Sequence, residues 1–166
     1  RDRTQREVLD LRAMFAVLIE DCLHDSGAKA ETVRCHFSGR ATLYFDRSHF
    51  HQVFANLMHN ALRHASGGVG SVEVRVEDGR SDGWIDIHVL NDGPPIEGRY
   101  REQIFEPFFT THTKGTGLGL FIARELCATD GASLELAPAA SGAHFIVAGR
   151  NDTCQLPEPN GARAAN

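Results

Sequence analysis

The chain has 166 residues, of which 42% are hydrophobic and 23% are charged, and its formal net charge is −5. This composition is typical of a single globular domain and excludes collagen-like, coiled-coil and fully disordered chains. No run approaches the roughly 18 uninterrupted apolar residues of a membrane span, and the negative charge argues against a dedicated nucleic-acid binder. We therefore expect a cytoplasmic domain that contacts neither nucleic acid nor a membrane, although its parent protein can still be membrane-anchored.

The chain begins at Arg1 rather than at a methionine, so we expect a piece of a longer protein or a processed end. No basic-then-apolar leader opens it. The four cysteines are widely spaced and form no Cys-x-x-Cys pair; they are Cys22, Cys35, Cys127 and Cys154. This spacing predicts reduced thiols rather than a zinc site or a disulfide framework.

Apolar residues three and four apart predict an amphipathic helix over residues 7–24. Short strands are expected at 33–37 and 42–45. The clearest helix is predicted over 48–65, because one of its faces is apolar throughout. Its opposite stripe repeats at strict i, i+4 spacing and consists of Gln52, Asn56, Asn60 and His64. The glycine-rich stretch 66–70 ends this helix.

Alternating apolar and polar residues at 72–77 and 85–90 predict a hairpin in a sheet that is covered on one face. A short helix is expected near 98–105, stopped by Pro107. A loop is expected over 108–116.

The last predicted helix covers residues 117–129, and a second hairpin is expected from 133–137 and 143–148. From Arg150 the composition turns polar, so we expect residues 150–166 to be a disordered tail. Together the elements predict a two-layer α/β sandwich with helices on one face of a mostly antiparallel sheet.

Three glycines alternate in the segment Gly115-Thr116-Gly117-Leu118-Gly119-Leu120, which leads into a predicted helix. Glycine lets backbone N–H groups approach an anion closely, and a helix N-terminus adds a favourable dipole. Such a segment is suited to binding phosphate. The alternative is that it is an ordinary flexible loop. The segment is neither a P-loop, which needs Lys-Ser or Lys-Thr after the last glycine, nor a dinucleotide fingerprint, which needs two residues between its second and third glycines.

The polar stripe of helix 48–65 aligns two carboxamides and an imidazole, those of Asn56, Asn60 and His64. The guanidinium of Arg63 lies beside them. Carboxamide oxygens suit Mg²⁺, which keeps several waters and binds substrate phosphates. Arg63 or His64 could then contact phosphate oxygens. Taken alone, the stripe is better explained as a solvated helix face, because polar residues opposite an apolar face are normal.

The turn Asn91-Asp92-Gly93 follows a predicted strand. A side-chain carbonyl there can accept a hydrogen bond from an exocyclic amine such as that of adenine, and Gly93 would let a flat ring lie against the backbone. The alternative is a plain turn, because these residue types are the commonest turn residues.

Four motifs that follow one another in a fixed order favour ligand-binding roles for these residues over an ordinary loop, helix face and turn. They resemble the N box, first glycine box, F box and second glycine box of the ATP-binding catalytic domain of bacterial sensor histidine kinases, in the wider family shared with gyrase, the Hsp90 chaperones and mismatch-repair ATPases. The matching segments are 52–61, 91–96, 105–109 and 115–120. The resemblance covers residues 40–148, and the phrase Ala123-Arg124-Glu125-Leu126-Cys127 is similar to the nitrogen-regulation and pilus-regulation kinases.

The resemblance implies the Bergerat ATP-binding fold, an α/β (α+β) two-layer sandwich with a mixed, mostly antiparallel sheet. It implies ATP and Mg²⁺ as ligands, with Mg²⁺ held by Asn60 and Asn56, and phosphate or ribose contacted by Arg63 and His64. The phosphates would lie in a cradle under a lid at 110–114 based on Phe108 and Phe109. The residues implied for the cradle are Lys114, Gly115, Thr116, Gly117, Leu118, Gly119 and Leu120.

Two residues depart from the family pattern. Asn91 stands where the family usually has the aspartate that reads adenine, so the hydrogen bond loses its charge and affinity for the nucleotide is expected to be weaker. Pro95 replaces the second glycine of the same box, which stiffens the backbone and removes an N–H donor.

The residue type at position 56 helps to distinguish ATP hydrolysis from transfer of the γ-phosphoryl group. In hydrolysing members of the wider family, a glutamate four residues before the Mg²⁺-binding asparagine activates water, and that position is Asn56 here. A carboxamide cannot serve as a general base. The sequence therefore favours transfer of the γ-phosphoryl group to a protein nucleophile, which needs mainly positioning and charge neutralisation.

None of the nine histidines lies in a phosphoacceptor motif; His24 and Asp25 begin one, but Ser26-Gly27 breaks it. We therefore expect the acceptor on an upstream dimerisation and phosphoacceptor domain of the parent chain. Residues 1–24 would connect to that domain, and residues 25–149 would form the catalytic domain. The partners implied are ATP and ADP, that upstream domain and a response regulator. Two alternatives remain: a serine kinase of the anti-sigma-factor type, and a degenerate nucleotide-binding or interaction module.

Overall fold

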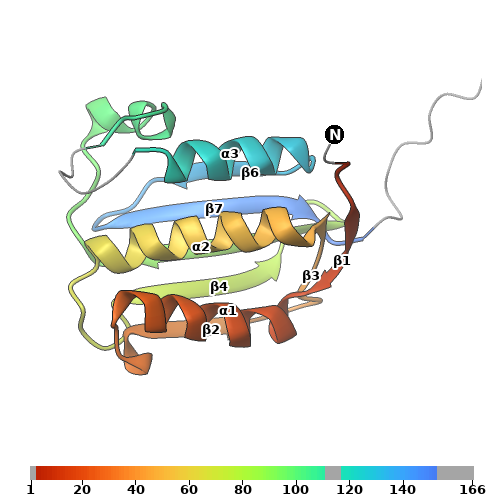
Figure 1. Cartoon of the computed structure of the whole chain (residues 1–166), viewed down its shortest axis with the longest axis horizontal. Helices are drawn as coiled ribbons and strands as arrows, with labels where there is room; N and C mark the ends of the chain where they lie inside the picture. The colour runs from red at the N-terminus through yellow and green to blue at the C-terminus, as the bar shows by residue number, and fades with distance from the viewer. Residues whose placement is uncertain (1–2, 111–116, 153–166) are drawn as a thin grey trace, which may run out of the picture.

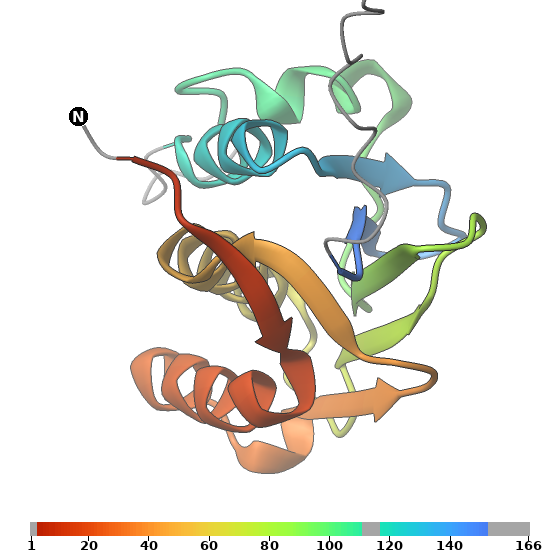
Figure 2. The ribbon, with the colours of Figure 1, turned by 90° about the vertical axis from the view of Figure 1, so that its right-hand side faces the viewer.

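The computed structural model describes residues 3–110 and 117–152 (Figure 1). In this part of the chain, three α-helices lie against one face of a five-stranded sheet (Figure 2). The helices are α1 (Leu11–Ser26), α2 (Arg47–His64) and α3 (Gly119–Thr129). The strands, in spatial order, are β2 (Val33–Phe37), β4 (Val72–Asp78), β5 (Trp84–Asn91), β7 (Ala143–Arg150) and β6 (Ser133–Ala137).

Strand β2 runs parallel to β4, and the other neighbouring pairs of this sheet are antiparallel. Alternation places Val72, Val74 and Val76 on the buried face of β4, and Val74 stands opposite Val89 of β5. These findings confirm the predicted two-layer α/β sandwich with a mixed, mostly antiparallel sheet and helices on one face. No helix among the described residues has the length and apolar character that crossing a membrane would need.

The helix predicted over residues 7–24 is wrong at its start. Residues Arg6–Asp10 form strand β1, which pairs antiparallel with β3 (Thr42–Asp46) in a separate two-stranded sheet. Leu9 is the buried residue of this strand, and the other four residues of β1 are exposed. The carboxylate of Asp10 accepts a hydrogen bond from the Ala13 N–H (3.3 Å) and so caps α1 at Leu11.

Helices α1 and α2 share an aromatic core. The rings of Phe15 and Phe54 stack with centroids 4.4 Å apart, and Phe50 lies 6.0 Å from Phe15; all three side chains are buried. Stacking of this kind adds to the free energy gained from burying apolar area. Residues 11–24 therefore belong to the same core as α2, while a connection from residues 1–24 to an upstream domain stays a prediction.

The helix predicted at 98–105 is instead two short 3₁₀ turns, η2 (Gly98–Tyr100) and η3 (Gln103–Phe105). Gly98 at one end and Pro107 at the other leave too little chain for stable α-helical hydrogen bonding, and 3₁₀ bonds serve such short pieces. Helix α3 begins two residues later than predicted.

The structure also corrects the start of the predicted tail. Strand β7 includes Arg150, the carbonyl of Asn151 accepts a hydrogen bond from the Thr42 hydroxyl (2.9 Å), and Asp152 pairs with Arg40 (2.7 Å). Residues 150–152 are therefore part of the fold. The rest of the predicted tail, residues 153–166, lies outside the described residues.

The cysteines that the structure describes are free thiols. Burial raises the pKa of Cys22 and of Cys35 to about 11, and that of Cys127 to about 12. These thiols stay protonated at neutral pH, which makes them poor nucleophiles. Cys154 lies outside the described residues.

A buried carboxylate joins the end of α3 to strand β3 and helix α2. Asp130, which follows α3, accepts the backbone N–H of Asp46 at 2.8 Å, and its other oxygen lies 2.6 Å from Nδ1 of His49. Its side chain is fully enclosed. Because an unpaired buried carboxylate is costly, these partners hold the end of α3 against the start of α2.

Asp46 itself begins α2 and sets a dependence of stability on pH. Burial of its carboxylate opposes ionisation, but hydrogen bonds outweigh that effect. The donors are the backbone N–H groups of Gln5 and His49 and the hydroxyl of Ser48. Together they lower the pKa of Asp46 from 3.8 to about 2.

Asp46→Asn should reveal this contribution. A carboxyl whose pKa is lower in the folded state stabilises the fold above its unfolded pKa of 3.8, and the effect is lost as the pH falls toward 2. The free energy of unfolding of the wild type should therefore exceed that of Asp46→Asn by a constant amount above about pH 4, and the gap should shrink between pH 4 and 2. Urea unfolding across that range measures it. Because the asparagine oxygen still caps α2, a gap that does not change with pH would contradict the assignment.

Candidate functional site

A cleft of about 620 Å³ lies beside α2 and the start of α3, and its far wall is formed by residues 94–110 and the end of β5. It brings together most residues predicted for the site. Those that line it are Asn56, Asn60, Arg63, His64, Asn91, Gly117, Gly119 and Leu120. Three separate segments of the chain, at 56–64, 91 and 117–120, therefore meet in one cavity.

Five predicted residues are not among those lining the cleft. Gly93 lies just behind its wall, and Leu118 directly precedes α3, where its carbonyl accepts the Ile122 N–H at 2.9 Å. The other three, Lys114, Gly115 and Thr116, lie outside the described residues.

Asn56 ties the two helices of the site together. Its Nδ2 donates a hydrogen bond to the carbonyl of Gly119, the first residue of α3, at 3.1 Å. A Cβ built on Gly119 would lie 3.9 Å from the Asn56 side chain, which is ordinary contact. The carboxamide of Asn56 therefore positions the start of α3 directly above the polar stripe of α2.

Asn60 lies one turn further along α2 and lines the same cleft. Among the residues that the structure describes, its carboxamide has no recorded hydrogen-bond partner, so both of its polar atoms can serve a ligand. His59, which the sequence did not single out, also lines the cleft, and its Nε2 lies 3.9 Å from the carboxylate of Asp25.

At the turn after β5, two adjacent polar residues, Asn91 and Asp92, point in different directions. Asp92 faces away from the cleft: it accepts hydrogen bonds from the backbone N–H (2.8 Å) and the hydroxyl (2.7 Å) of Ser66, and these bonds lower the pKa of its carboxyl. Asn91 is buried and lines the cleft. Its Oδ1 accepts the N–H of Gly93 at 3.0 Å. Asn91, and not Asp92, is therefore the residue that can meet a ligand.

Gly93 lies against the end of α2. A Cβ built on it would overlap the carbonyl oxygen of His64, so no other residue type fits without moving one of the two backbones. This contact fixes the end of β5, and with it Asn91, against the last turn of α2.

The far wall of the cleft is apolar, and the sequence did not predict it. Ile96, Tyr100 and Ile104 line it together with Phe109 and Phe145. The rings of Tyr100 and Phe109 lie 5.5 Å apart. The four-residue spacing of the first three was a readable signal, but Phe145 comes from the distant strand β7. A flat aromatic ligand could bury itself against such a wall.

Phe108 is exposed, and most of the lid whose base it is predicted to form lies outside the described residues. The side chain of Phe108 is 73% exposed and its backbone has a φ of 66°, a conformation that bulky residues rarely adopt. Its N–H donates to the carbonyl of Gly117 at 2.9 Å, and a Cβ on Gly117 would lie 2.7 Å from the Phe108 Cα. Only glycine at 117 allows this close backbone approach. Phe109, by contrast, lines the cleft.

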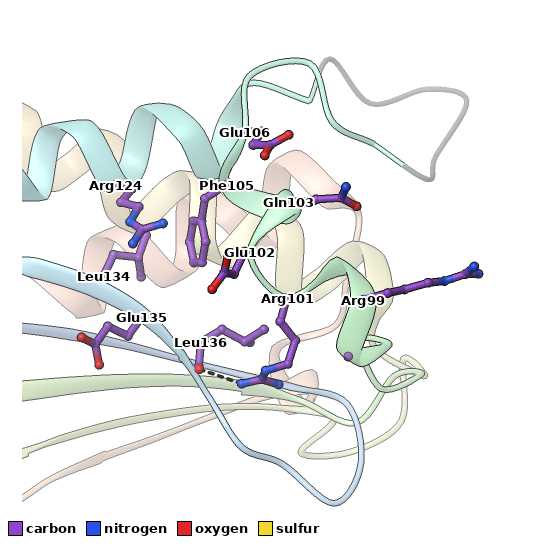
Figure 3. A pocket seen from close by; sticks show the side chains of 11 residues that line it. Arg99, Arg101, Glu102, Gln103, Phe105, Glu106, Arg124, Leu134, Glu135 and Leu136 are labelled. Carbon is purple, nitrogen blue, oxygen red and sulfur yellow. Dashed lines mark hydrogen bonds between the residues drawn. The ribbon is translucent and has the colours of Figure 1, made fainter.

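A second cleft, of about 780 Å³, lies between the η2–η3 segment, α3 and β6 (Figure 3). None of the predicted site residues lines it. Arg101 reaches across it and donates to the Leu136 carbonyl at 2.8 Å, and Arg124 lies over the Phe105 ring at 4.6 Å. These contacts hold the η2–η3 segment, which carries Tyr100 and Ile104 to the first cleft.

Comparison with known proteins supports the family implied by the four motifs. The family model described as histidine kinase-, DNA gyrase B- and HSP90-like ATPase matches residues 45–152. The two-component sensor PprA of Pseudomonas aeruginosa is 44% identical over 102 residues, which are 58% of this chain and 11% of that protein. The sensor protein kinase PilS of the same organism is 39% identical over 93 residues, 54% of this chain and 17% of that protein. The chain thus spans less than a fifth of either relative.

Solved structures agree in fold. The catalytic domain of histidine kinase ThkA superposes with a TM-score of 0.71 at 26% identity, covering 89% of this chain and 97% of that one. The mycobacterial sensor histidine kinase MprB superposes with a TM-score of 0.74 at 21% identity, covering 89% and 99%, and shows the shared fold. The matched region contains the whole of α2, the Asn91 turn and α3. The chain therefore belongs to the family of histidine kinase-, DNA gyrase B- and HSP90-like ATPases.

Proposed function

We propose that this chain binds Mg-ATP in the cleft beside α2 and donates the γ-phosphoryl group to a histidine on a separate dimerisation domain. The observation that carries the proposal is the convergence of Asn56, Asn60 and Asn91 in one cleft whose opposite wall is apolar. A nucleotide has matching parts: a flat apolar base with polar edges, and a charged phosphate chain.

The cleft has two chemically different ends. Asn91, Ile96 and Phe145 form an end that suits the base, because apolar walls surround one hydrogen-bonding side chain. Asn56, Asn60 and the start of α3 form the other end. There the N-terminus of α3 presents unpaired backbone N–H groups and a positive dipole, which stabilise phosphate.

The residues present fit Mg²⁺ on the phosphate chain. Asn60 offers a carboxamide oxygen, a hard ligand of the kind that Mg²⁺ accepts, and Asn56 lies one turn before it. Mg²⁺ usually takes few protein ligands and completes its shell with water and phosphate oxygens. When bound, the ion would neutralise charge on the phosphates. Arg63 and His64, at the end of α2, would contact the phosphates or the ribose.

Transfer is favoured over hydrolysis. The Asn56 carboxamide, which donates to Gly119, cannot take a proton from water, so efficient hydrolysis lacks its base at that position. The carboxylate that lines the described part of the cleft belongs to Glu97, and it pairs with Arg99 at 2.8 Å. Steady phosphate release by this chain alone should therefore stay near background.

The acceptor follows from relatives that are named as sensor kinases. We expect a phosphohistidine on an upstream domain of the parent protein and onward transfer to a response regulator. Labelling the full-length parent with γ-labelled ATP tests this. An acid-labile, base-stable label supports histidine. An acid-stable label would favour a serine kinase of the anti-sigma-factor type, and no label with no nucleotide binding would favour a degenerate module.

Asn60→Ala should weaken Mg²⁺-dependent nucleotide binding while leaving the fold intact, because Asn60 lies on the polar face of α2. Loss of a metal ligand should reduce affinity by at least tenfold, about 1.4 kcal/mol. Isothermal titration calorimetry with a non-hydrolysable ATP analogue, with and without Mg²⁺, measures this.

Gln52→Ala is the matched control for Asn60→Ala. Gln52 occupies the same stripe two turns earlier, is exposed and does not line the cleft. Its affinity should equal that of the wild type. Equal affinity of the Asn60 variant and this control would remove Asn60 from the metal site.

Gly93→Ala should disrupt the packing of the end of β5 against the end of α2, although Gly93 itself does not line the cleft. The added methyl group would collide with the His64 carbonyl and crowd Asn91, so α2 and the end of β5 must separate. Overpacking of this kind typically lowers stability by about 1–3 kcal/mol. We expect a lower melting temperature and weaker nucleotide binding. Gly98→Ala is the control, because a Cβ there meets nothing within 4 Å; similar behaviour of the two variants would contradict the packing argument.

A further inference from the structure

We infer that Asn91 allows the base end of the cleft to accept 6-oxopurine nucleotides, those of guanine and hypoxanthine, alongside adenine nucleotides. The inference rests on the proposed nucleotide site and concerns which base it selects. It depends on the direction in which one carboxamide points.

The orientation of the Asn91 amide is fixed by its neighbour. Oδ1 lies 3.0 Å from the backbone nitrogen of Gly93. A backbone N–H can only donate, so the atom facing it must be the oxygen and not the NH₂ group. The other end of the amide, Nδ2, therefore lies on the opposite side of the same side chain.

The space beside the oxygen excludes a side chain, because a Cβ on Gly93 would lie 3.0 Å from Oδ1 and a Cβ on Gly142 would lie 3.3 Å from it. None of the described residues accepts a hydrogen bond from Nδ2, although Asn91 is only 6% exposed and lines the cleft. Oδ1 already accepts the Gly93 N–H, so the group of Asn91 that has no partner among the described residues is a hydrogen-bond donor.

A donor at this place selects for an acceptor on the base. Guanine and hypoxanthine carry a carbonyl oxygen at ring position 6, which can accept from Nδ2. Adenine carries an amine there, so a donor would face a donor. To bind adenine in the same pose, the amide must turn over and break its bond to Gly93, or the ring must slide until its N1 meets Nδ2.

The rest of the base end does not distinguish the purines. Ile96 and Phe145 offer apolar surface to either ring system. A carboxylate at position 91 would behave differently, because both of its oxygens accept: one could keep the Gly93 bond while the other takes the adenine amine. The identity of residue 91 is therefore the switch between strict adenine selection and relaxed purine selection.

Calorimetric titration of the chain with ADP, GDP and IDP in Mg²⁺ tests the inference. IDP differs from GDP by lacking the 2-amino group, so it isolates position 6. The dissociation constants of the wild type for ADP and IDP should agree within about tenfold. Asn91→Asp should move their ratio toward ADP by at least tenfold, through tighter ADP and weaker IDP binding.

Asp92→Asn is the matched control, because residue 92 faces Ser66 and not the cleft. An asparagine there can still accept the Ser66 N–H and pair with its hydroxyl, so the junction with the end of α2 is kept and the ratio should stay unchanged. ADP bound more than about tenfold tighter than IDP by the wild type would overturn the inference, even if Asn91→Asp does not fold. The inference would also be overturned if the ratio of the dissociation constants for ADP and IDP were the same in Asn91→Asp as in the wild type. Absence of binding for all three nucleotides would overturn both the inference and the proposed function, whereas ADP binding alone leaves the proposed function standing.

Discussion

The backbone contact between Gly93 and the carbonyl of His64 is the constraint on which the site depends. It brings the end of strand β5 against the end of helix α2 with no room for a side chain between them. Asp92 strengthens the same junction through its two hydrogen bonds to Ser66. Because both elements are otherwise held by the core, the distance between Asn91 and the polar stripe of α2 is set by backbone packing rather than by flexible side chains.

Helix α2 carries both the core and the chemistry. Its buried face is made of Phe50, Val53, Phe54, Leu57, Met58 and Ala61. The opposite stripe holds Asn56 and Asn60, and the helical repeat keeps the two faces in a fixed relation. A change that rotates the helix to repack its core would therefore also turn the asparagines away from the ligand. Asn56 adds a second restraint, since its bond to Gly119 holds α3 in place.

The sequence predicted the parts of this structure that depend on local patterns. The periodicity of α2 and the alternation in β4 and β5 were sufficient to find them, and the four motifs located the cleft. The strand at 6–10 was missed because its identity depends on pairing with β3, which local spacing does not record. The contribution of Phe145 to the cleft, and the orientation of the Asn91 amide, likewise follow only from contacts between distant segments.

Among the described residues, strand β7 comes last in sequence but lies inside the sheet, between β5 and β6. Until it is in place, β5 has a bare edge and β6 has no neighbour in the sheet. Formation of the fold therefore waits for contacts of long sequence separation, which slow folding and leave unpaired strand edges exposed in the meantime. During synthesis on the ribosome, the cleft beside α2 would take shape only after β7, which supplies Phe145, has emerged, so this cavity should be completed late.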